Sequence, residues 1–110
     1  MIRIGRSQAL LVAVCLLLGA GTPSAQEMQS YTLDKINKFG TIYVGHREAS
    51  VPFSYVDADG KAIGFSMDLC GHVVEAVKVK LGRPDLAVVP VPTTSGTRQM
   101  MVEAGTIDLQ

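Results

Sequence analysis

Two stretches of this chain place hydrophobic residues at helical spacing, and a third, shorter stretch is also helix-like. Thr32–Gly40 carries an apolar residue at every third position and ends in a glycine, as amphipathic helices often do. Ser66–Leu81 repeats apolar side chains every three or four residues and is followed by Gly82. Gln99–Ala104 is stopped by a glycine in the same way. The pattern therefore predicts three helices.

Between these helices, short runs of β-branched and apolar residues predict strands. Thr41–Val44 is one such run, and Gly45 closes it. Ala87–Val91 is an uninterrupted apolar run, which is typical of a strand buried on both faces of a parallel sheet. Thr106–Leu109 predicts one more strand near the end of the sequence.

A hairpin is predicted between the first strand and the long helix. The segment Asp57–Gly60 ends in Asp-Gly, a strong turn signal, and separates the strand-like runs Pro52–Val56 and Lys61–Phe65. Gln26–Tyr31 is polar, and we expect a flexible leader there. Since helices alternate with buried strands, the order predicts an α/β fold with a largely parallel sheet. Ligands of such sheets bind at the carboxyl ends of the strands.

The first 25 residues have the three-part composition of a secretory signal peptide. Arg3 and Arg6 make the start basic, Ala9–Gly19 is apolar, and Thr22–Ala25 supplies small residues before a cleavage site that we expect after Ala25. An uncleaved membrane anchor is the less favoured alternative, because the apolar run of about a dozen residues is shorter than the ~20 that a spanning helix needs. We therefore expect cleavage within a few residues of Ala25 and export to the periplasm.

Removal of residues 1–25 changes the charge and cysteine content. The mature part, residues 26–110, keeps eight basic and ten acidic residues. It has no basic stripe, which argues against a nucleic-acid partner, and no second long apolar run. Cys15 leaves with the signal, so Cys70 is the cysteine expected in the mature part, as a small buried helix residue without a disulfide.

Candidate chemistry lies directly after two predicted strands. Thr94–Arg98 follows Ala87–Val91 and opens a helix, so backbone N–H groups, the Ser95 hydroxyl and the Arg98 guanidinium are expected to meet there and hold a carboxylate. Arg47 follows the first strand in a comparable position. Two arginines at strand ends suggest a ligand with more than one carboxylate. The alternatives are a capped helix with a solvated Arg98 and a surface ion pair of Arg47 with Glu48 or another neighbour.

Other candidate residues are weaker. Phe53 and Tyr55 are expected either in the core, which we favour, or along a cleft wall. His46 and His72 lack the spacing of a metal site, and His72 is expected to be exposed. We find no pattern for a catalytic group, a metal or a cofactor, and so predict that the protein is not an enzyme.

Several motifs together resemble the glutamate/aspartate periplasmic binding proteins, which are polar amino-acid receptors of ABC importers. The resemblance keeps its spacing across essentially the whole mature part. Its motifs are Thr32-Leu33-Asp34-Lys35-Ile36, Gly40-Thr41-Ile42, Gly45-His46-Arg47-Glu48, Val51-Pro52-Phe53-Ser54-Tyr55, Gly64-Phe65-Ser66-Met67-Asp68-Leu69, Thr94-Ser95-x-x-Arg98 and Gly105-Thr106-Ile107-Asp108-Leu109.

The resemblance implies a bilobed fold of type II, with the ligand in a cleft that closes on it. It implies that Arg98, assisted by Ser95, holds the ligand α-carboxylate and that Arg47 holds the side-chain carboxylate. The partners implied are glutamate or aspartate and an inner-membrane ABC permease. Residues 26–110 then correspond to an incomplete N-terminal lobe, because the family continues with a Gly-Ser-Thr-Thr-type segment and a second lobe.

About a third of such a protein supplies only one wall of the cleft. We therefore expect these 110 residues alone to show no measurable glutamate binding and to leave an unpaired sheet edge. Three alternatives stay open: the first lobe of a periplasmic dehydratase, the sensor lobe of a membrane receptor, and a small complete domain of unrelated function.

Overall fold

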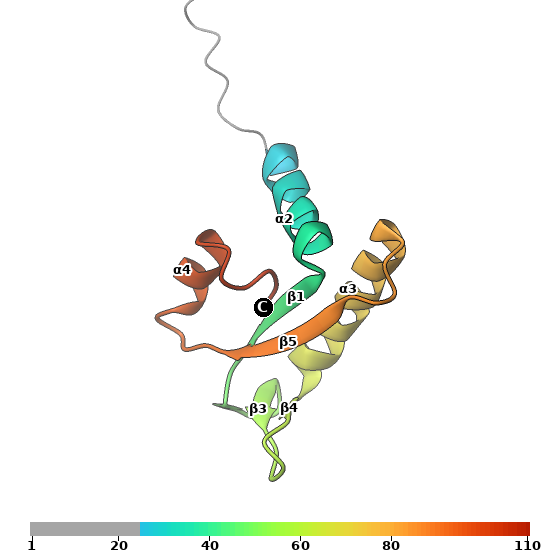
Figure 1. Ribbon diagram of the computed structural model, residues 1–110. Coiled ribbons are helices and arrows are strands. Elements are labelled where there is room, and N and C mark those ends of the chain that lie inside the picture. Colours follow the sequence, from blue (N-terminus) through green and yellow to red (C-terminus); the bar gives the residue numbers. More distant parts are fainter. Residues whose placement is uncertain (1–24) are drawn as a thin grey trace, which may run out of the picture.

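The computed structural model describes residues 25–110, so the predicted signal peptide lies outside the described residues except for Ala25. Helix α2 covers Ala25–Phe39 (Figure 1). It ends where the Gly40 N–H donates a 2.8 Å hydrogen bond to the Ile36 carbonyl. The predicted flexible leader, Gln26–Tyr31, is wrong. This segment contains neither proline nor glycine and is rich in helix-forming residues, so the helix runs through it.

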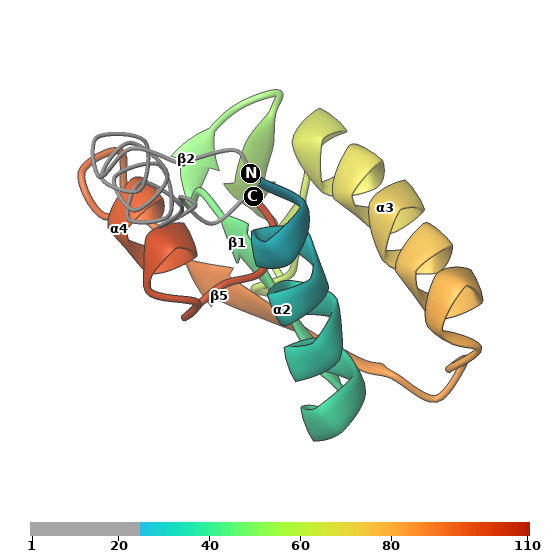
Figure 2. The ribbon, with the colours of Figure 1, turned by 90° about the horizontal axis from the view of Figure 1, so that it is seen from above.

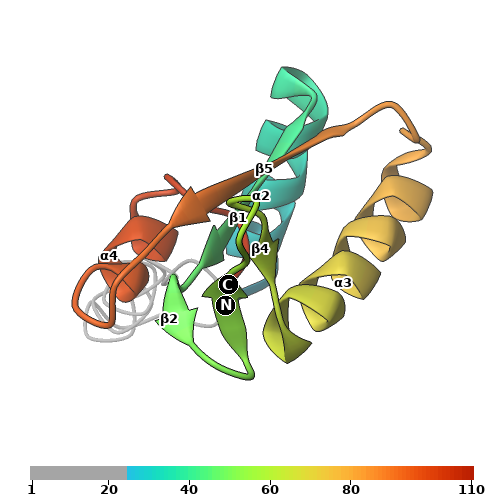
Figure 3. The ribbon, with the colours of Figure 1, turned by 90° about the horizontal axis from the view of Figure 1, so that it is seen from below.

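Strand β1 (Thr41–His46) pairs in parallel with β5 (Ala87–Pro92), in a register that sets Thr41 beside Ala87 and His46 beside Pro92. The strand continues past the predicted end at Val44, because Gly45 takes part in the pairing. Helices α3 and α4 lie on opposite sides of this pair (Figures 1 and 3). The carboxyl ends of β1 and β5 therefore lie at the same edge of the sheet.

The predicted strand Thr106–Leu109 is wrong in extent. Within the described residues it forms a single parallel bridge, between Leu109 and Val44 on the side of β1 away from β5. The main-chain N–H of Tyr43 donates to the Asp108 carboxylate at 2.9 Å instead of to a neighbouring carbonyl. A side chain thus occupies the place of a ladder hydrogen bond, and the segment does not continue as a strand.

The prediction that Ala87–Val91 is buried on both faces is also wrong. Val88 and Val89 in β5 are 44% and 37% exposed. Within the described residues β1 is the only strand that pairs with β5. An apolar run indicates that a strand is more stable when buried, but it does not determine which other element covers the strand.

A small antiparallel sheet confirms the predicted hairpin, with shorter strands. It consists of β2 (Ala49–Ser50), β3 (Ser54–Val56) and β4 (Ala62–Ile63), in that order. The Asp57 carboxylate stabilises the turn between β3 and β4, since its Oδ1 accepts main-chain N–H bonds from Asp59 and Lys61, each at 2.9 Å. Strand β2 was not predicted, because two residues carry no periodicity.

Helix α3 (Phe65–Leu81) confirms the long predicted helix. Gly82 ends it in the left-handed conformation, with φ of 62°, and the N–H groups beyond the last turn bond back to its carbonyls. His72 is exposed, as expected. The core lies where α2 and α3 meet the sheet (Figure 2). Its buried residues are Ile36, Ile42, Val44, Cys70, Val74 and Leu86.

Arg83 joins the ends of the two long helices. Its guanidinium donates to both carboxylate oxygens of Asp85 at 2.8 Å and to the Asn37 carbonyl at 2.9 Å. The hydrogen bonds from Arg83 hold the pKa of Asp85 below its usual range. This cluster lies near Gly40, at the amino ends of β1 and β5.

None of the helices within residues 25–110 combines the length and the hydropathy needed to cross a lipid bilayer.

Candidate functional site

The carboxyl ends of β1 and β5 bring the predicted site residues together. Arg47 follows β1 directly, while the loop after β5 carries Ser95 and leads into α4 (Arg98–Glu103). Arg47 Nη1 donates a hydrogen bond to Ser95 Oγ, although these residues lie 48 positions apart in the sequence. Parallel pairing in register explains this meeting, because both chains leave the sheet at the same edge.

Arg47 and Arg98 line the same pocket, which has a volume of about 270 Å³. Ser95 is not part of the lining and reaches the pocket through Arg47. The lining combines two guanidinium groups, hydroxyl groups, an imidazole, an amide and a few apolar side chains. Its members are Gly45, His46, Arg47, Ser50, Phe53, Ser54, Ser66, Met67, Cys70, Arg98 and Gln110.

Neither arginine of the pocket has a carboxylate partner within the described residues. The ion pairs there are Lys35–Asp108, Lys78–Glu75 and Arg83–Asp85. The alternative of an ion pair between Arg47 and its neighbour Glu48 is therefore not what the structure contains. The pocket lining includes neither Asp nor Glu among these residues. Two cations without a counterion make this wall suited to an anionic ligand.

The loop before α4 bonds part of its own main chain, while the N–H groups of Ser95 and Gly96 have no partner among the described residues. The Thr94 N–H donates to Thr97 Oγ1 at 3.0 Å, and the Thr97 N–H donates to Thr94 Oγ1 at 3.2 Å. The Arg98 N–H donates to the Thr94 carbonyl at 3.1 Å. Because the two threonines bond each other's main chain, the two ends of the loop are held together. The donors left for an anion at this edge are the guanidinium groups and the N–H groups of Ser95 and Gly96.

Phe53 contributes to the pocket and is 57% exposed. The preference for a core position is therefore wrong for Phe53. It lies in the turn between β2 and β3, where its N–H donates to the Ser50 carbonyl at 2.8 Å, so its ring lies at the surface. Tyr55 follows in β3 and is half-buried.

Sequence reasoning missed several lining residues, above all the serines of the hairpin region and Gln110. Ser50 and Ser54 pair across β2 and β3, so they reach the pocket only because the hairpin folds back over the end of β1. Gln110 arrives from the segment beside β1, and its amide donates to Thr93 Oγ1 at 2.8 Å. The short spacing of Arg47, Ser50 and Ser54 was a usable signal, but isolated serines are common in turns.

Cys70 is buried between the pocket and the core, as predicted. Burial raises the pKa of its thiol, so the neutral form is favoured and the sulfur is a poor nucleophile at neutral pH. Among residues 25–110, no group of three or more His, Cys, Asp and Glu side chains is arranged to hold a metal ion.

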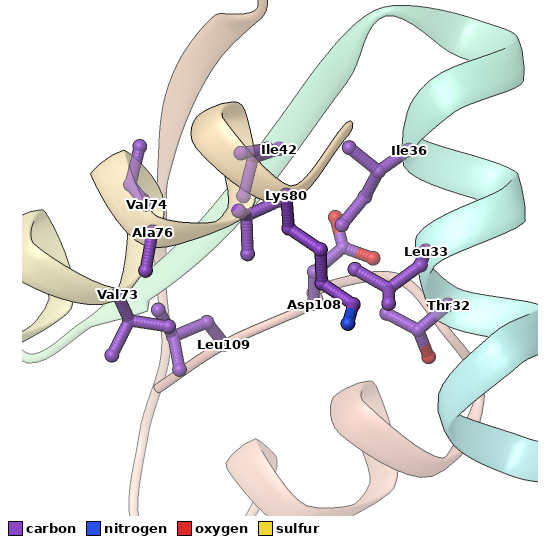
Figure 4. Close-up of a pocket in the computed structure, with 11 residues that line it drawn as sticks. Thr32, Leu33, Ile36, Ile42, Val73, Val74, Ala76, Lys80, Asp108 and Leu109 are labelled. Atoms are coloured by element: carbon purple, nitrogen blue, oxygen red, sulfur yellow. The ribbon is translucent and has the colours of Figure 1, made fainter. Parts of the chain in front are cut away.

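A second pocket, of about 350 Å³, lies between α2 and α3. In Figure 4, Leu33 and Ile36 of α2 lie opposite Val73, Val74 and Ala76 of α3. Its polar groups include Asp108, which is already paired with a lysine. This mostly apolar pocket does not suit a ligand with two carboxylates.

Comparison with known proteins identifies the family. The family model of the bacterial extracellular solute-binding proteins, family 3, matches residues 42–110. The chain belongs to this family. The match covers β5, all of β1 except Thr41, and the whole candidate pocket. The resemblance drawn from the sequence motifs is thereby confirmed.

Individual relatives of this family 3 protein include both receptors and an enzyme. The glutamate/aspartate import solute-binding protein of Escherichia coli K12 is 47% identical over 100 residues, which cover 88% of this chain and 33% of that protein. An ancestral cationic amino acid solute-binding protein is 32% identical with a TM-score of 0.58, covering 69% of this chain and 30% of the other. An ancestral cyclohexadienyl dehydratase is also 32% identical, with a TM-score of 0.55, covering 68% and 28%.

These likenesses confirm the α/β fold of type II periplasmic binding proteins. The chain spans about a third of the length of the curated relative that it matches.

Proposed function

We propose that this family 3 chain belongs to the substrate-binding component of an ABC amino-acid importer and serves to capture glutamate or aspartate. The observation that carries the proposal is the pair of arginines, Arg47 and Arg98, which line one pocket without a carboxylate partner among the described residues. Similarity to a glutamate/aspartate import protein supports the acidic ligand.

In this proposal each arginine binds one carboxylate. Arg98 binds the α-carboxylate common to all amino acids, with the Ser95 hydroxyl assisting. Arg47 binds the side-chain carboxylate and so selects acidic ligands. A planar guanidinium suits both tasks, because it donates two parallel hydrogen bonds to a carboxylate. The Arg47–Ser95 hydrogen bond supports the assignment by linking the two subsites before a ligand arrives.

The proposal extends to cellular location and partners. Residues 1–25 would act as a cleavable signal peptide, and residues 26–110 would form part of the N-terminal lobe of an exported protein. The partner would be an inner-membrane ABC permease that accepts the loaded receptor. The extracellular family assignment supports this location.

Titration calorimetry on the complete gene product tests the proposed function. We expect micromolar or tighter binding of glutamate or aspartate and much weaker binding of glutamine, which lacks the second carboxylate. Arg47→Gln should weaken glutamate binding roughly 10- to 100-fold, since a charge-assisted hydrogen bond contributes ~1.5–3 kcal/mol. Arg98→Gln should weaken binding of every amino acid that the protein accepts.

Arg83→Gln is the matched control, because this arginine lies near the amino ends of the strands, away from the pocket. It should leave glutamate affinity unchanged. Unaltered glutamate affinity after Arg47→Gln would contradict the assignment of the acidic subsite.

A periplasmic dehydratase is the second candidate, because of the structural likeness to an ancestral enzyme of that class. Elimination of water needs a group that takes and gives a proton. The pocket lining holds no Asp or Glu among the described residues, although it includes the imidazole of His46, which can carry a proton. The similarity to a glutamate/aspartate import protein favours binding over catalysis. Proton NMR of the bound and released ligand distinguishes the two, since a receptor returns the amino acid intact.

A further inference from the structure

Arg47 lies where the main chain leaves the sheet. β1 ends at His46 and β2 begins at Ala49, so no strand pairing holds Arg47 itself. The preceding carbonyl, that of His46, accepts two hydrogen bonds from Thr93, at 2.8 Å from its N–H and 3.1 Å from its hydroxyl. These bonds hold the peptide unit between His46 and Arg47 on its carbonyl side, and they leave the N–H and the carbonyl of Arg47 to be bonded by another residue.

Ser54 supplies both missing hydrogen bonds. Its hydroxyl oxygen accepts the Arg47 N–H at 2.8 Å, and its O–H donates to the Arg47 carbonyl at 3.2 Å. One hydroxyl has one donor and two acceptor sites, so both bonds form together. Ser54 is only 6% exposed, and its place is set by pairing with Ser50 across β2 and β3. His46 Nδ1 in β1 also lies 3.3 Å from the Arg47 carbonyl, but Ser54 bonds both the N–H and the carbonyl. The hairpin thus supplies the two-point contact that holds the base of the Arg47 side chain.

We propose that Ser54 is a positioning residue for Arg47: it fixes the main chain so that the guanidinium reaches Ser95 and the pocket. The positioning of Arg47 by Ser54 is independent of the proposed function; only the expected effect of Ser54 on ligand affinity rests on it. Ser54 also lines the pocket, yet its proton is already donated to the Arg47 carbonyl. It therefore acts through Arg47 and not by donating to a ligand carboxylate.

Hydrogen exchange without ligand tests the positioning itself. Ser54→Ala should reduce protection of the Arg47 amide about tenfold, because its acceptor is lost. Ser54→Thr keeps the hydroxyl and should restore most of the protection. Thr93→Val is the matched comparator, since it removes another buried hydroxyl bonded to the neighbouring His46 carbonyl. It should leave Arg47 protection unchanged. Equal Arg47 protection in wild type and Ser54→Ala would overturn the inference.

A double-mutant cycle in the complete gene product tests the consequence for binding. Ser54→Ala should weaken glutamate affinity about tenfold in the wild-type background and have no further effect in the Arg47→Gln background. An equal loss in both backgrounds would mean that Ser54 contacts the ligand directly, which would overturn its positioning role. If the wild type binds no acidic amino acid, the proposed function fails, while the exchange measurement still decides whether Ser54 holds Arg47.

Discussion

Gly45 in β1 lies where the sheet closely approaches another segment of the chain. A Cβ atom built there would lie 2.7 Å from Ile107 Cδ1 and 3.1 Å from Thr93 Cγ2. Ile107 is 1% exposed, so it has little room to move. The absence of a side chain lets the last described segment lie against β1, which brings Gln110 to the pocket.

Gly45→Ala should therefore lower the free energy of unfolding by about 1–3 kcal/mol, the usual cost of overpacking. Gly71→Ala in α3 is the matched control, because a Cβ there meets nothing within 4 Å. That helical substitution should raise stability by about 0.5–1 kcal/mol. Urea denaturation of the mature protein measures both changes. A Gly45→Ala protein as stable as the wild type would show that the segment does not pack closely on β1.

The candidate arginines could be predicted from the sequence as single residues. The other polar residues of the pocket, which contact or flank them, could not. Arg47, Ser95 and Arg98 follow strand ends, and parallel pairing brings such ends together whatever the intervening chain does. Ser54 and Gln110 reach the pocket through the fold of a hairpin and a single bridge. Those placements depend on side-chain hydrogen bonds between distant segments, which leave no periodic trace in the sequence.

Lys35 in α2 and Asp108 join the first and last described elements. Lys35 Nζ lies 2.6 Å from Asp108 Oδ1 and donates to the Gly105 carbonyl at 2.6 Å. The other carboxylate oxygen accepts the Tyr43 N–H. The Asp108 side chain is 2% exposed, so these partners take the place of water around its carboxylate.

Lys35→Met should lower the free energy of unfolding by about 3–5 kcal/mol, because it leaves a buried carboxylate without its cation. Lys35→Met combined with Asp108→Asn should recover a large part of that loss, since no charge is then buried. Lys78→Met is the control, as its partner Glu75 is 70% exposed, and it should change stability by less than about 1 kcal/mol. Thermal or urea unfolding measures all three. If Lys35→Met lowered the free energy of unfolding no more than Lys78→Met does, the stabilising role of the buried Lys35–Asp108 ion pair would be contradicted.

Sequence periodicity predicted elements better than it predicted their surroundings. The α3 helix and the hairpin were found because their signals are local: helical spacing in one and an Asp-Gly turn in the other. The burial of β5 was not, because the apolar run Ala87–Val91 does not specify which neighbour covers it. The segment before Gln110 was predicted as a strand, but the Asp108 carboxylate interrupts the ladder.

At the scale of the molecule, the prediction of export concerns residues 1–25. If the signal peptide is cleaved as expected, intact-mass measurement of the periplasmic product should give an N-terminus at Gln26 or within a few residues of it. Ala25→Phe places a large side chain at the cleavage site and should cause the precursor to accumulate. A periplasmic or membrane-bound product that retains Met1 would contradict the prediction and support an anchor.

The position of β1 in the sheet also has a consequence in time. β1 is complete at His46, but its partners are β5, which begins at Ala87, and the bridging residue Leu109. A ribosome adds ~5–20 residues per second, so on the order of seconds pass between the synthesis of β1 and the synthesis of the residues that pair with it. During this interval Ile42 and Val44, both 2% exposed in the finished fold, lie on an unpaired strand. An unpaired apolar strand is a binding site for a chaperone, and for β1 that site closes only when β5 and Leu109 have paired with it.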